Sequence, residues 1–239
     1  MRKKALITGA SKGIGAATAR LLAKEGYDLI LVCRKSVGKI NELRDDLISQ
    51  YKISCDMFVC DVADEKQVEK LFEQVSDVDL LINNAAVSHI GLMTDMSVSQ
   101  WKQVIDTNLN ALFYTCRCVV PGMVNRKSGK IINVSSVWGN VGASMEVAYS
   151  TAKGGVNSFT KALAKELAPS NIQVNAVAFG VIDTEMNACF SEEERESLIQ
   201  DIPADRMGTP EEAAHMIWQI VNAPEYFTGQ VVTMDGGWI

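Results

Sequence analysis

One tyrosine and one lysine are spaced so that they could form a proton-transfer site. Tyr149 and Lys153 stand four positions apart in the run Tyr149-Ser-Thr-Ala-Lys153, and on a helix residues i and i+4 share one face. A lysine ammonium beside a phenol favours the phenolate and lowers the phenol pKa, which is about 10 when unperturbed. Taken alone, such a pair is more often a packed tyrosine and a solvated lysine, so other motifs must decide.

A glycine-rich turn near the N-terminus predicts a nucleotide site. A short apolar run, residues 4–8, leads into Gly9-Ala-Ser-Lys-Gly13-Ile-Gly15, and a helical pattern follows over residues 16–25. Glycines let the backbone approach a pyrophosphate closely, and the N–H groups at a helix start attract anions. The spacing differs from the usual dinucleotide fingerprint, and no Gly-Lys-Ser/Thr follows, which excludes a mononucleotide P-loop. A purely structural turn is the alternative, but the position between a strand and a helix favours the nucleotide.

Seven apolar runs alternate with amphipathic stretches of helical length. This alternation predicts an α/β fold, with residues 1–239 forming a single Rossmann-like domain: a doubly wound parallel sheet of about seven strands with helices on both faces. Ligands of such sheets bind at the carboxyl ends of the strands, which is where the polar motifs of this chain fall. The expected strands are Lys4–Thr8, Asp28–Cys33, Met57–Cys60, Leu80–Asn83, Lys130–Val134, Gln173–Val177 and Gln230–Met234.

Composition and charge argue against several classes of function. The 239 residues carry a formal charge of −6 without a block of lysines and arginines, so no nucleic-acid partner is expected. No segment approaches the roughly 18 apolar residues that span a bilayer, and the apolar run behind the basic start is too short for a secretory signal. We therefore expect a soluble, cytoplasmic protein that has no membrane partner.

The cysteines are expected to be reduced thiols, and no metal site is expected. Cys116 and Cys118 lie two positions apart in a helical pattern, where they do not share a face. The two histidines, His89 and His215, show no spacing typical of metal ligands. A chain without an export signal usually keeps its thiols reduced. The other cysteines are Cys33, Cys55, Cys60 and Cys189.

Together, these motifs resemble the classical short-chain dehydrogenase/reductase family over essentially the whole chain. The motifs are Thr8-Gly9-Ala-Ser-Lys-Gly13-Ile-Gly15, Asn83-Asn84-Ala85-Ala86, Asn108, Ser136, Tyr149 with Lys153, and Thr228-Gly-Gln-Val-Val-Thr-Met-Asp235-Gly-Gly-Trp238. Two positions depart from the family pattern, because Ala86 replaces a usual glycine and Phe179 replaces the usual proline before Gly180. Without the proline, φ is less restricted and the backbone N–H is present. The sequence therefore does not determine the path of the chain beside the nicotinamide.

The resemblance implies reversible hydride transfer between a nicotinamide and a carbonyl carbon. Tyr149 would protonate the carbonyl oxygen, and Ser136 would stabilise the developing alkoxide by donating a hydrogen bond. Lys153 would lower the pKa of Tyr149 and bind the nicotinamide ribose, while Asn108 would anchor a water that relays protons. The alternative for Asn108 is a helix residue with a local backbone bond. Ser135 is the neighbouring hydroxyl, but the family separation from the tyrosine selects Ser136.

The residues after the second expected strand favour NADP(H) over NAD(H). An acidic residue about 20 positions beyond the glycine turn usually binds the ribose 2′-hydroxyl, whereas an arginine there accommodates a 2′-phosphate. This chain has Arg34 and Lys35 at that place, and Lys12 in the turn adds a third cation. Three solvated surface cations are the alternative interpretation.

The resemblance completes the expected cofactor set. Asp61 and Val62 would contact the adenine end, Asn83 the adenosine side of the groove, and Ile182 with Thr184 the nicotinamide carboxamide. The whole set is Gly9, Ser11, Lys12, Gly13, Ile14, Gly15, Arg34, Lys35, Asp61, Val62, Asn83, Ala85, Tyr149, Lys153, Gly180, Ile182 and Thr184.

The resemblance leaves the ketone substrate open. Family breadth favours a 3-oxoacyl-acyl-carrier-protein reductase of fatty acid biosynthesis, although that acidic carrier is normally met by basic residues and the obvious neighbours here are Glu146, Asp183 and Glu185. The stretch around Trp138 also resembles the subgroup that reduces an aminopentanone modification on elongation factor P, where Glu146 could pair with the amine. A different ketone or hydroxysteroid dehydrogenase and a non-catalytic NADP-sensing protein are further alternatives.

Three more expectations concern the surroundings of the site. His89 is a candidate substrate residue in the loop after the fourth strand, although a lone loop histidine is more often a surface residue. Residues 183–206 could form a mobile lid over the substrate, or a solvated surface helix capped by Ser191. Because family members are commonly homotetramers, a homo-oligomer is expected.

Overall fold

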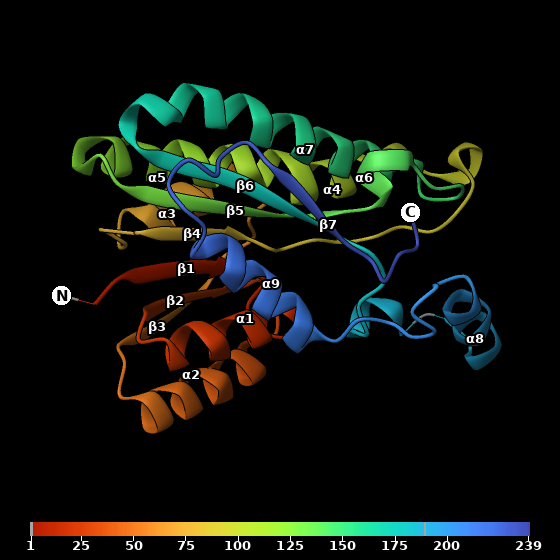
Figure 1. Cartoon of the computed structure of the whole chain (residues 1–239), viewed down its shortest axis with the longest axis horizontal. Coiled ribbons are helices and arrows are strands. Elements are labelled where there is room, and N and C mark those ends of the chain that lie inside the picture. The colour runs from red at the N-terminus through yellow and green to blue at the C-terminus, as the bar shows by residue number, and fades with distance from the viewer. Residues whose placement is uncertain (1, 189) are drawn as a thin grey trace.

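The protein is built around a seven-stranded parallel sheet, as the computed structural model of residues 2–188 and 190–239 shows (Figure 1). The strand order is β3-β2-β1-β4-β5-β6-β7, and every neighbouring pair is parallel. The predicted fold class is therefore confirmed. The strands are β1 (Lys4–Thr8), β2 (Asp28–Cys33), β3 (Cys55–Val59), β4 (Leu80–Asn83), β5 (Gly129–Ser136), β6 (Ile172–Phe179) and β7 (Val231–Met234).

Helices cover both faces of the sheet, and each face has its own apolar cluster. On one face α1, α2 and α9 pack against the strands, and on the other α3, α5 and α7 do so, while α4 packs against α7 (Figure 1). The helices are α1 (Gly13–Lys24), α2 (Val37–Tyr51), α3 (Glu65–Phe72), α4 (Val98–Ile105), α5 (Ala111–Arg126), α6 (Trp138–Val141), α7 (Val147–Leu167), α8 (Glu192–Gln200) and α9 (Pro210–Val221).

Some expected element ends were wrong by a few residues. The third strand begins at Cys55 rather than Met57, and α1 begins at Gly13, inside the expected turn. The strands β5 and β6 extend past their expected ends to Ser136 and Phe179, which face each other in register. The extension of β5 brings Ser135 and Ser136 into the sheet ladder at its carboxyl edge, where apolar content no longer marks a strand, and the extension of β6 adds Ala178 and Phe179.

The carboxyl ends of β1 and β4 are joined by side-chain hydrogen bonds. The Thr8 hydroxyl accepts from the backbone N–H groups of Asn84 and Ala85 at 3.0 and 3.1 Å, and the Asn84 amide donates to the Thr8 carbonyl at 2.9 Å. Connections from β1 and β4 leave toward opposite faces of the sheet, which creates the crevice where ligands of this fold class bind.

One excursion of the chain, residues 183–207, projects from the carboxyl edge, and we call it the cap segment. Its two ends meet, because the Gly208 N–H donates to the Val181 carbonyl at 2.9 Å and the Asp183 N–H donates to the Gly208 carbonyl at 2.8 Å. The segment contains α8, which lies apart from the packed layers (Figure 1). The expected cap of this helix is confirmed, since Ser191 and Glu194 form a reciprocal capping box.

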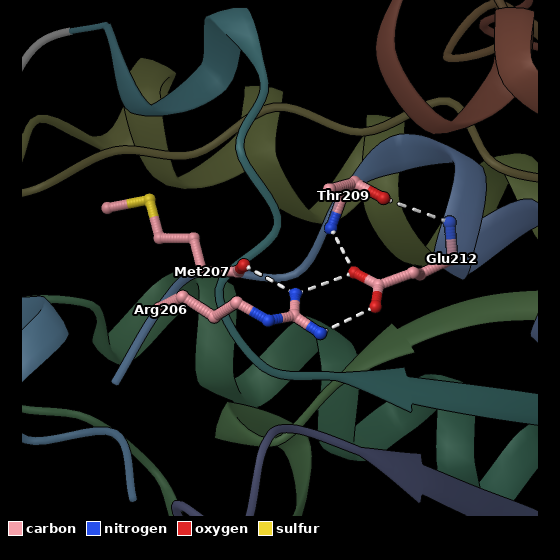
Figure 2. Close-up of polar contacts among 4 residues, drawn as sticks. All are labelled: Arg206, Met207, Thr209 and Glu212. Atoms are coloured by element: carbon pink, nitrogen blue, oxygen red, sulfur yellow. Dashed lines mark hydrogen bonds and ion pairs between the residues drawn. The ribbon is translucent and has the colours of Figure 1, made fainter. Parts of the chain in front are cut away.

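An ion pair fixes the return of the cap segment into α9. Figure 2 shows that the Arg206 guanidinium donates hydrogen bonds to both carboxylate oxygens of Glu212; these bonds are 2.8 and 2.6 Å long. The Thr209 N–H donates to the same carboxylate at 2.9 Å, and the Thr209 hydroxyl caps α9 by accepting from the Glu212 N–H at 3.1 Å. The carboxyl-terminal end of the cap segment is thus anchored to a helix of the main body.

The described cysteines are free, and four of them, Cys33, Cys55, Cys60 and Cys116, are buried. Burial raises the pKa of Cys116 to about 12, which keeps this thiol protonated. Cys189 lies outside the described residues, and so does Met1. Within residues 2–188 and 190–239, no three ligand-type side chains gather into a group that could hold a metal ion, and no helix is long and apolar enough to cross a membrane.

Candidate active site

A cavity of about 500 Å³ lies at the carboxyl ends of the strands and gathers most of the predicted site residues. Gly15, Asn83, His89 and Asn108 are the predicted residues that do not line it. Those that do are Gly9, Ser11, Lys12, Gly13, Ile14, Arg34, Lys35, Asp61, Val62, Ala85, Ser136, Trp138, Glu146, Tyr149, Lys153, Gly180, Ile182 and Thr184.

The glycine-rich turn is shaped by close backbone approaches. Gly9 has φ +67°, and a Cβ there would lie 2.8 Å from the Cα of Ala85. A Cβ at Gly15 would overlap the Gly9 carbonyl oxygen, so this third glycine lets α1 pack against the turn without reaching the cavity. The turn ends at Gly13, where α1 begins with neither a side-chain cap nor an acidic residue in its first turn. Its amino end is therefore suited to an anionic group.

The three predicted catalytic side chains converge from β5 and α7. Ser136 is the last residue of β5, while Tyr149 and Lys153 occupy successive turns at the start of α7. The Ser136 hydroxyl hydrogen-bonds to the Tyr149 side chain. The Lys153 Nζ lies 5.5 Å from the centre of the Tyr149 ring and donates to the Val134 carbonyl at 2.7 Å. The neighbouring hydroxyl of Ser135 is instead bound to Asn157 at 2.6 Å.

The expected direction of the Tyr149 pKa shift was wrong. Burial raises the pKa of Tyr149 above its ordinary value, and the charge of Glu146 raises it further, against a smaller opposing effect of the Ser136 hydrogen bond. Burial also lowers the pKa of Lys153 to about 8. Desolvation is therefore the largest cause of both pKa shifts, and Tyr149 is protonated at neutral pH. That is the form that can donate a proton.

Asn108 holds a loop in place rather than facing the cavity. It lies in a π-helical turn, residues Asp106–Asn110, between α4 and α5, and is completely buried. Its side chain accepts from the Val87 N–H at 2.8 Å and donates to the Val87 carbonyl at 2.7 Å. A backbone bond was the expected alternative, but the partner lies on the segment after β4 and is not local.

Asn83 belongs to a buried polar network instead of the cavity wall. Its side chain accepts from the Thr115 hydroxyl at 2.8 Å and donates to Asn133 at 2.9 Å, which ties β4 to α5 and β5. The next residue, Asn84, lines the cavity and binds the Thr8 and Gly9 carbonyls. Sequence reasoning missed Asn84, although it stands within the Asn-Asn-Ala-Ala motif.

Two of the three cations predicted for the cofactor phosphate, Arg34 and Lys12, form ion pairs with carboxylates. Arg34 lies 3.6 Å from Asp61, and Lys12 lies 2.9 Å from Glu185. A third cation, Lys39, lies 2.6 Å from the other oxygen of Glu185. Sequence reasoning did not include Lys39, although it lies in the first turn of α2, which follows Arg34 and Lys35.

Two tryptophans and one carboxylate form the other end of the cavity. The rings of Trp138 and Trp238 lie 4.8 Å apart between centroids at 59°. The Trp138 side chain hydrogen-bonds to Glu146, and burial raises the pKa of that carboxyl. Trp238 was not predicted as a site residue. His89 does not line the cavity, whereas its neighbours Ser88 and Ile90 do.

The two departures from the family pattern are accommodated locally. Ala86 lines the cavity, and Phe179 extends β6 by pairing with Ser136 on one side and Met234 on the other. The following Gly180 is tightly confined, since a Cβ there would lie 2.8 Å from the Cα of Asp235.

Comparison of the sequence with known proteins identifies its family and several relatives. Residues 3–195 match the family model described as short chain dehydrogenase. The chain is 39% identical over 240 residues to "Uncharacterized oxidoreductase YmfI" of Bacillus subtilis, covering 100% of this chain and 99% of the relative. It is 40% identical over 244 residues to the 3-oxoacyl-[acyl-carrier-protein] reductase FabG of Thermotoga maritima, covering 98% and 97%.

A solved structure repeats the fold over the full length. The crystal structure of YwfH, described as an NADPH-dependent reductase involved in bacilysin biosynthesis, superposes with a TM-score of 0.94. It covers 100% of this chain and 99% of that chain at 23% sequence identity, so the likeness concerns the fold alone.

Proposed function

The chain belongs to the short-chain dehydrogenase family of oxidoreductases, and from this premise we propose that it is an NADP(H)-dependent ketone reductase. The observation that carries the proposal is the meeting of Ser136, Tyr149 and Lys153 in the same cavity as the glycine-rich turn. The proposed proton donor Tyr149, the hydrogen-bond donor Ser136 and the backbone of the glycine-rich turn therefore line the same cavity.

The residues of the turn and of β2 fit a phosphorylated dinucleotide. The uncapped start of α1 and the positive φ of Gly9 and Gly13 suit a pyrophosphate that approaches the backbone. Lys12, Arg34 and Lys35 line the cavity beside the end of β2, where a 2′-phosphate would be held. When bound there, NADP(H) would supply or accept the hydride.

The protein's own groups manage the proton and the developing charge. Tyr149, whose raised pKa keeps the hydroxyl protonated, donates its proton to the carbonyl oxygen of the ketone. Ser136 donates a hydrogen bond to the same oxygen and stabilises its negative charge. Lys153 fixes the first turns of α7 against β5 through the Val134 carbonyl and places an ammonium group near the Tyr149 ring.

A direct assay tests the proposed reaction. The purified protein is given NADPH and a panel of ketones, and loss of the reduced-nicotinamide absorbance is followed alongside product analysis. Turnover that requires both ketone and Tyr149 supports the reductase. Tight NADPH binding without turnover of any ketone would instead favour the NADP-sensing alternative.

Two classes of ketone are candidates for the substrate of this site. The curated relatives named 3-oxoacyl-[acyl-carrier-protein] reductases, at 33–40% identity, favour a 3-oxoacyl thioester on an acyl carrier protein. An acidic carrier would approach an acidic surface, however, because the first turn of α8 in the cap segment is Glu192-Glu193-Glu194 and Glu185 lines the cavity.

Glu146 specifically favours the second class, a ketone that bears an amine, such as the aminopentanone modification on elongation factor P. The Glu146 carboxyl lines the cavity next to the proton donor Tyr149. Its pKa is raised because burial disfavours the charged carboxylate. A cationic ligand would offset that cost. We therefore place the amine-bearing ketone first on geometry. Side-by-side kcat/KM values for an amino-ketone and a 3-oxoacyl thioester decide between the two.

The family resemblance also supports a homo-oligomer, proposed to be a tetramer. Sedimentation of the purified protein over a range of concentrations measures that state directly.

A further inference from the structure

One carboxylate at the rim of the cavity is held by two lysines from separate parts of the fold. Glu185 Oε2 lies 2.9 Å from the Lys12 Nζ, and Glu185 Oε1 lies 2.6 Å from the Lys39 Nζ. Lys12 lies in the glycine-rich turn just before α1, and Lys39 lies in the first turn of α2. Glu185 begins the short helical turn Glu185–Asn187 of the cap segment. The two ammonium groups therefore converge on a single anion.

This arrangement is a small anion site with an anion already inside it. The hydrogen bonds from Lys39 and Lys12 lower the pKa of Glu185 to about 2, so the carboxylate is charged at any physiological pH. All three side chains are about half exposed, at 50–55%. Exposed pairs of this kind contribute little net stability and are screened by salt. Another anion can replace the carboxylate at small cost.

The location of the two lysines identifies the replacing anion. Lys12 lines the cavity, and Lys39 follows Arg34 and Lys35, which line the cavity at the end of β2. In addition, α2 starts with neither a side-chain cap nor an acidic residue in its first turn. A phosphate monoester carries more charge than a carboxylate and offers three acceptor oxygens, so it is the stronger partner for two ammonium groups.

We propose that Lys12 and Lys39 form the site for the 2′-phosphate of NADP(H), and that Glu185 is an internal anion that occupies this site until the phosphate displaces it. The inference rests on the proposed use of NADP(H) and adds a specificity-determining lysine and a built-in competitor. NADH has no 2′-phosphate and leaves the Glu185 contacts in place.

The exchange also links cofactor choice to the cap segment. The Ile182–Gly208 contact ties the two ends of the segment together, and Arg206 with Glu212 anchors its carboxyl-terminal end. Glu185 connects its amino-terminal end to α2 and the glycine-rich turn. Displacing Glu185 removes that connection, so binding of a 2′-phosphate frees the part of the cap segment next to Thr184.

Binding measurements without turnover test the proposal. Dissociation constants are measured by calorimetry for NADPH, NADH, adenosine 2′,5′-bisphosphate and adenosine 5′-monophosphate. Glu185→Gln removes the competitor, and we expect roughly fivefold tighter binding of the two ligands with a 2′-phosphate and no change for the other two. Lys39→Ala should weaken the same two ligands about tenfold. In the double variant, the gain from Glu185→Gln should shrink, since one of the released lysines is gone.

Two control variants separate this site from a general charge effect. Glu192→Gln removes one negative charge from the same cap segment, and Lys24→Ala removes one positive charge from the exposed end of α1. Neither should change the preference for a 2′-phosphate. Thermal unfolding followed by circular dichroism verifies that each variant is folded.

The outcomes distinguish failure of the inference from failure of the proposed cofactor. If the wild-type protein prefers NADPH and neither Glu185→Gln nor Lys39→Ala alters that preference, the internal-anion proposal is wrong and the reductase proposal stands. Equal effects of Glu185→Gln on NADPH and NADH would also overturn the inference. A wild-type protein that binds neither dinucleotide, or prefers NADH, would overturn the proposed cofactor itself.

Discussion

The Nζ of Lys153 donates a hydrogen bond to the Val134 carbonyl oxygen at 2.7 Å, which places an ammonium group in the closed space between α7 and β5. The side chain is only 2% exposed, and burial lowers its pKa from 10.5 to about 8. Burying a charged lysine in such a position lowers the free energy of unfolding. Such a loss of stability is typical of groups at a reaction centre, and Lys153 lies at the proposed one.

We predict that Lys153→Met stabilises the fold while it removes activity. At pH 7 wild-type Lys153 is charged and buried, so the variant should gain on the order of 1–3 kcal/mol in the free energy of unfolding. The folded pKa lies below the unfolded one, so between pH 8 and 10.5 the unfolded state binds more protons and wild-type stability rises with pH. Lys153→Met should lack this rise.

Urea unfolding at pH 7 and pH 9.5 measures both effects. Lys161→Met, an exposed position on the same helix, is the matched control and should follow the wild type. A Lys153→Met variant that is less stable than the wild type at pH 7 would contradict the prediction.

Tyr149→Phe should reduce the rate of ketone reduction by roughly 10²–10⁴-fold, the scale of a general acid. The NADPH dissociation constant should stay nearly unchanged, since only the proton donor is removed. Tyr226→Phe, at a fully exposed tyrosine, is the control. Steady-state kinetics and a binding titration provide the two numbers, and turnover of Tyr149→Phe within tenfold of the wild type would reject the assignment.

The elements that carry the site could be predicted because their signals are local. Each apolar run that marks a strand, the glycine-rich turn and the spacing of Tyr149 and Lys153 lies within a short stretch of sequence. The raised pKa of Tyr149 could not be predicted, because it depends on how deeply the ring is buried after folding. The same is true of Glu185 and Lys39, which are far apart in sequence and meet only in the folded chain.

Asn83 illustrates a second limit. Its motif is what marks it as a cofactor residue, but only the folded sheet shows that its amide is already satisfied by Thr115 and Asn133. A buried side chain with all its hydrogen bonds made inside the protein has little left to offer a ligand. Sequence spacing gives the neighbourhood of such a residue, not the direction of its side chain.

Arg34→Asp should shift the cofactor preference from NADPH toward NADH. A carboxylate at the end of β2 repels a 2′-phosphate and can accept a hydrogen bond from a 2′-hydroxyl. Arg34 also lies 3.6 Å from Asp61, so the substitution adds a second carboxylate there and should weaken NADPH further. The ratio of the kcat/KM values for the two cofactors is the measurement, with Lys102→Asp on α4 as the control. An unchanged ratio would assign the preference to Lys12, Lys35 and Lys39.

Glu146→Gln tests whether the carboxylate beside Tyr149 recognises a cation. Glutamine keeps the shape and can still accept the hydrogen bond from Trp138, so the substitution removes the charge alone. For an amino-ketone we expect KM to rise roughly tenfold, the scale of one charge-assisted hydrogen bond of about 1.5 kcal/mol. A neutral ketone of equal length should be unaffected in KM.

The same variant makes a second, independent prediction through Tyr149. The Glu146 charge raises the pKa of the phenol, so its removal should move the alkaline fall of the reduction rate to lower pH for every ketone. Glu192→Gln, on α8, should do neither. A KM increase of equal size for charged and neutral ketones would eliminate the recognition of an amine, and the pH profile would then show whether Glu146 acts on the phenol alone.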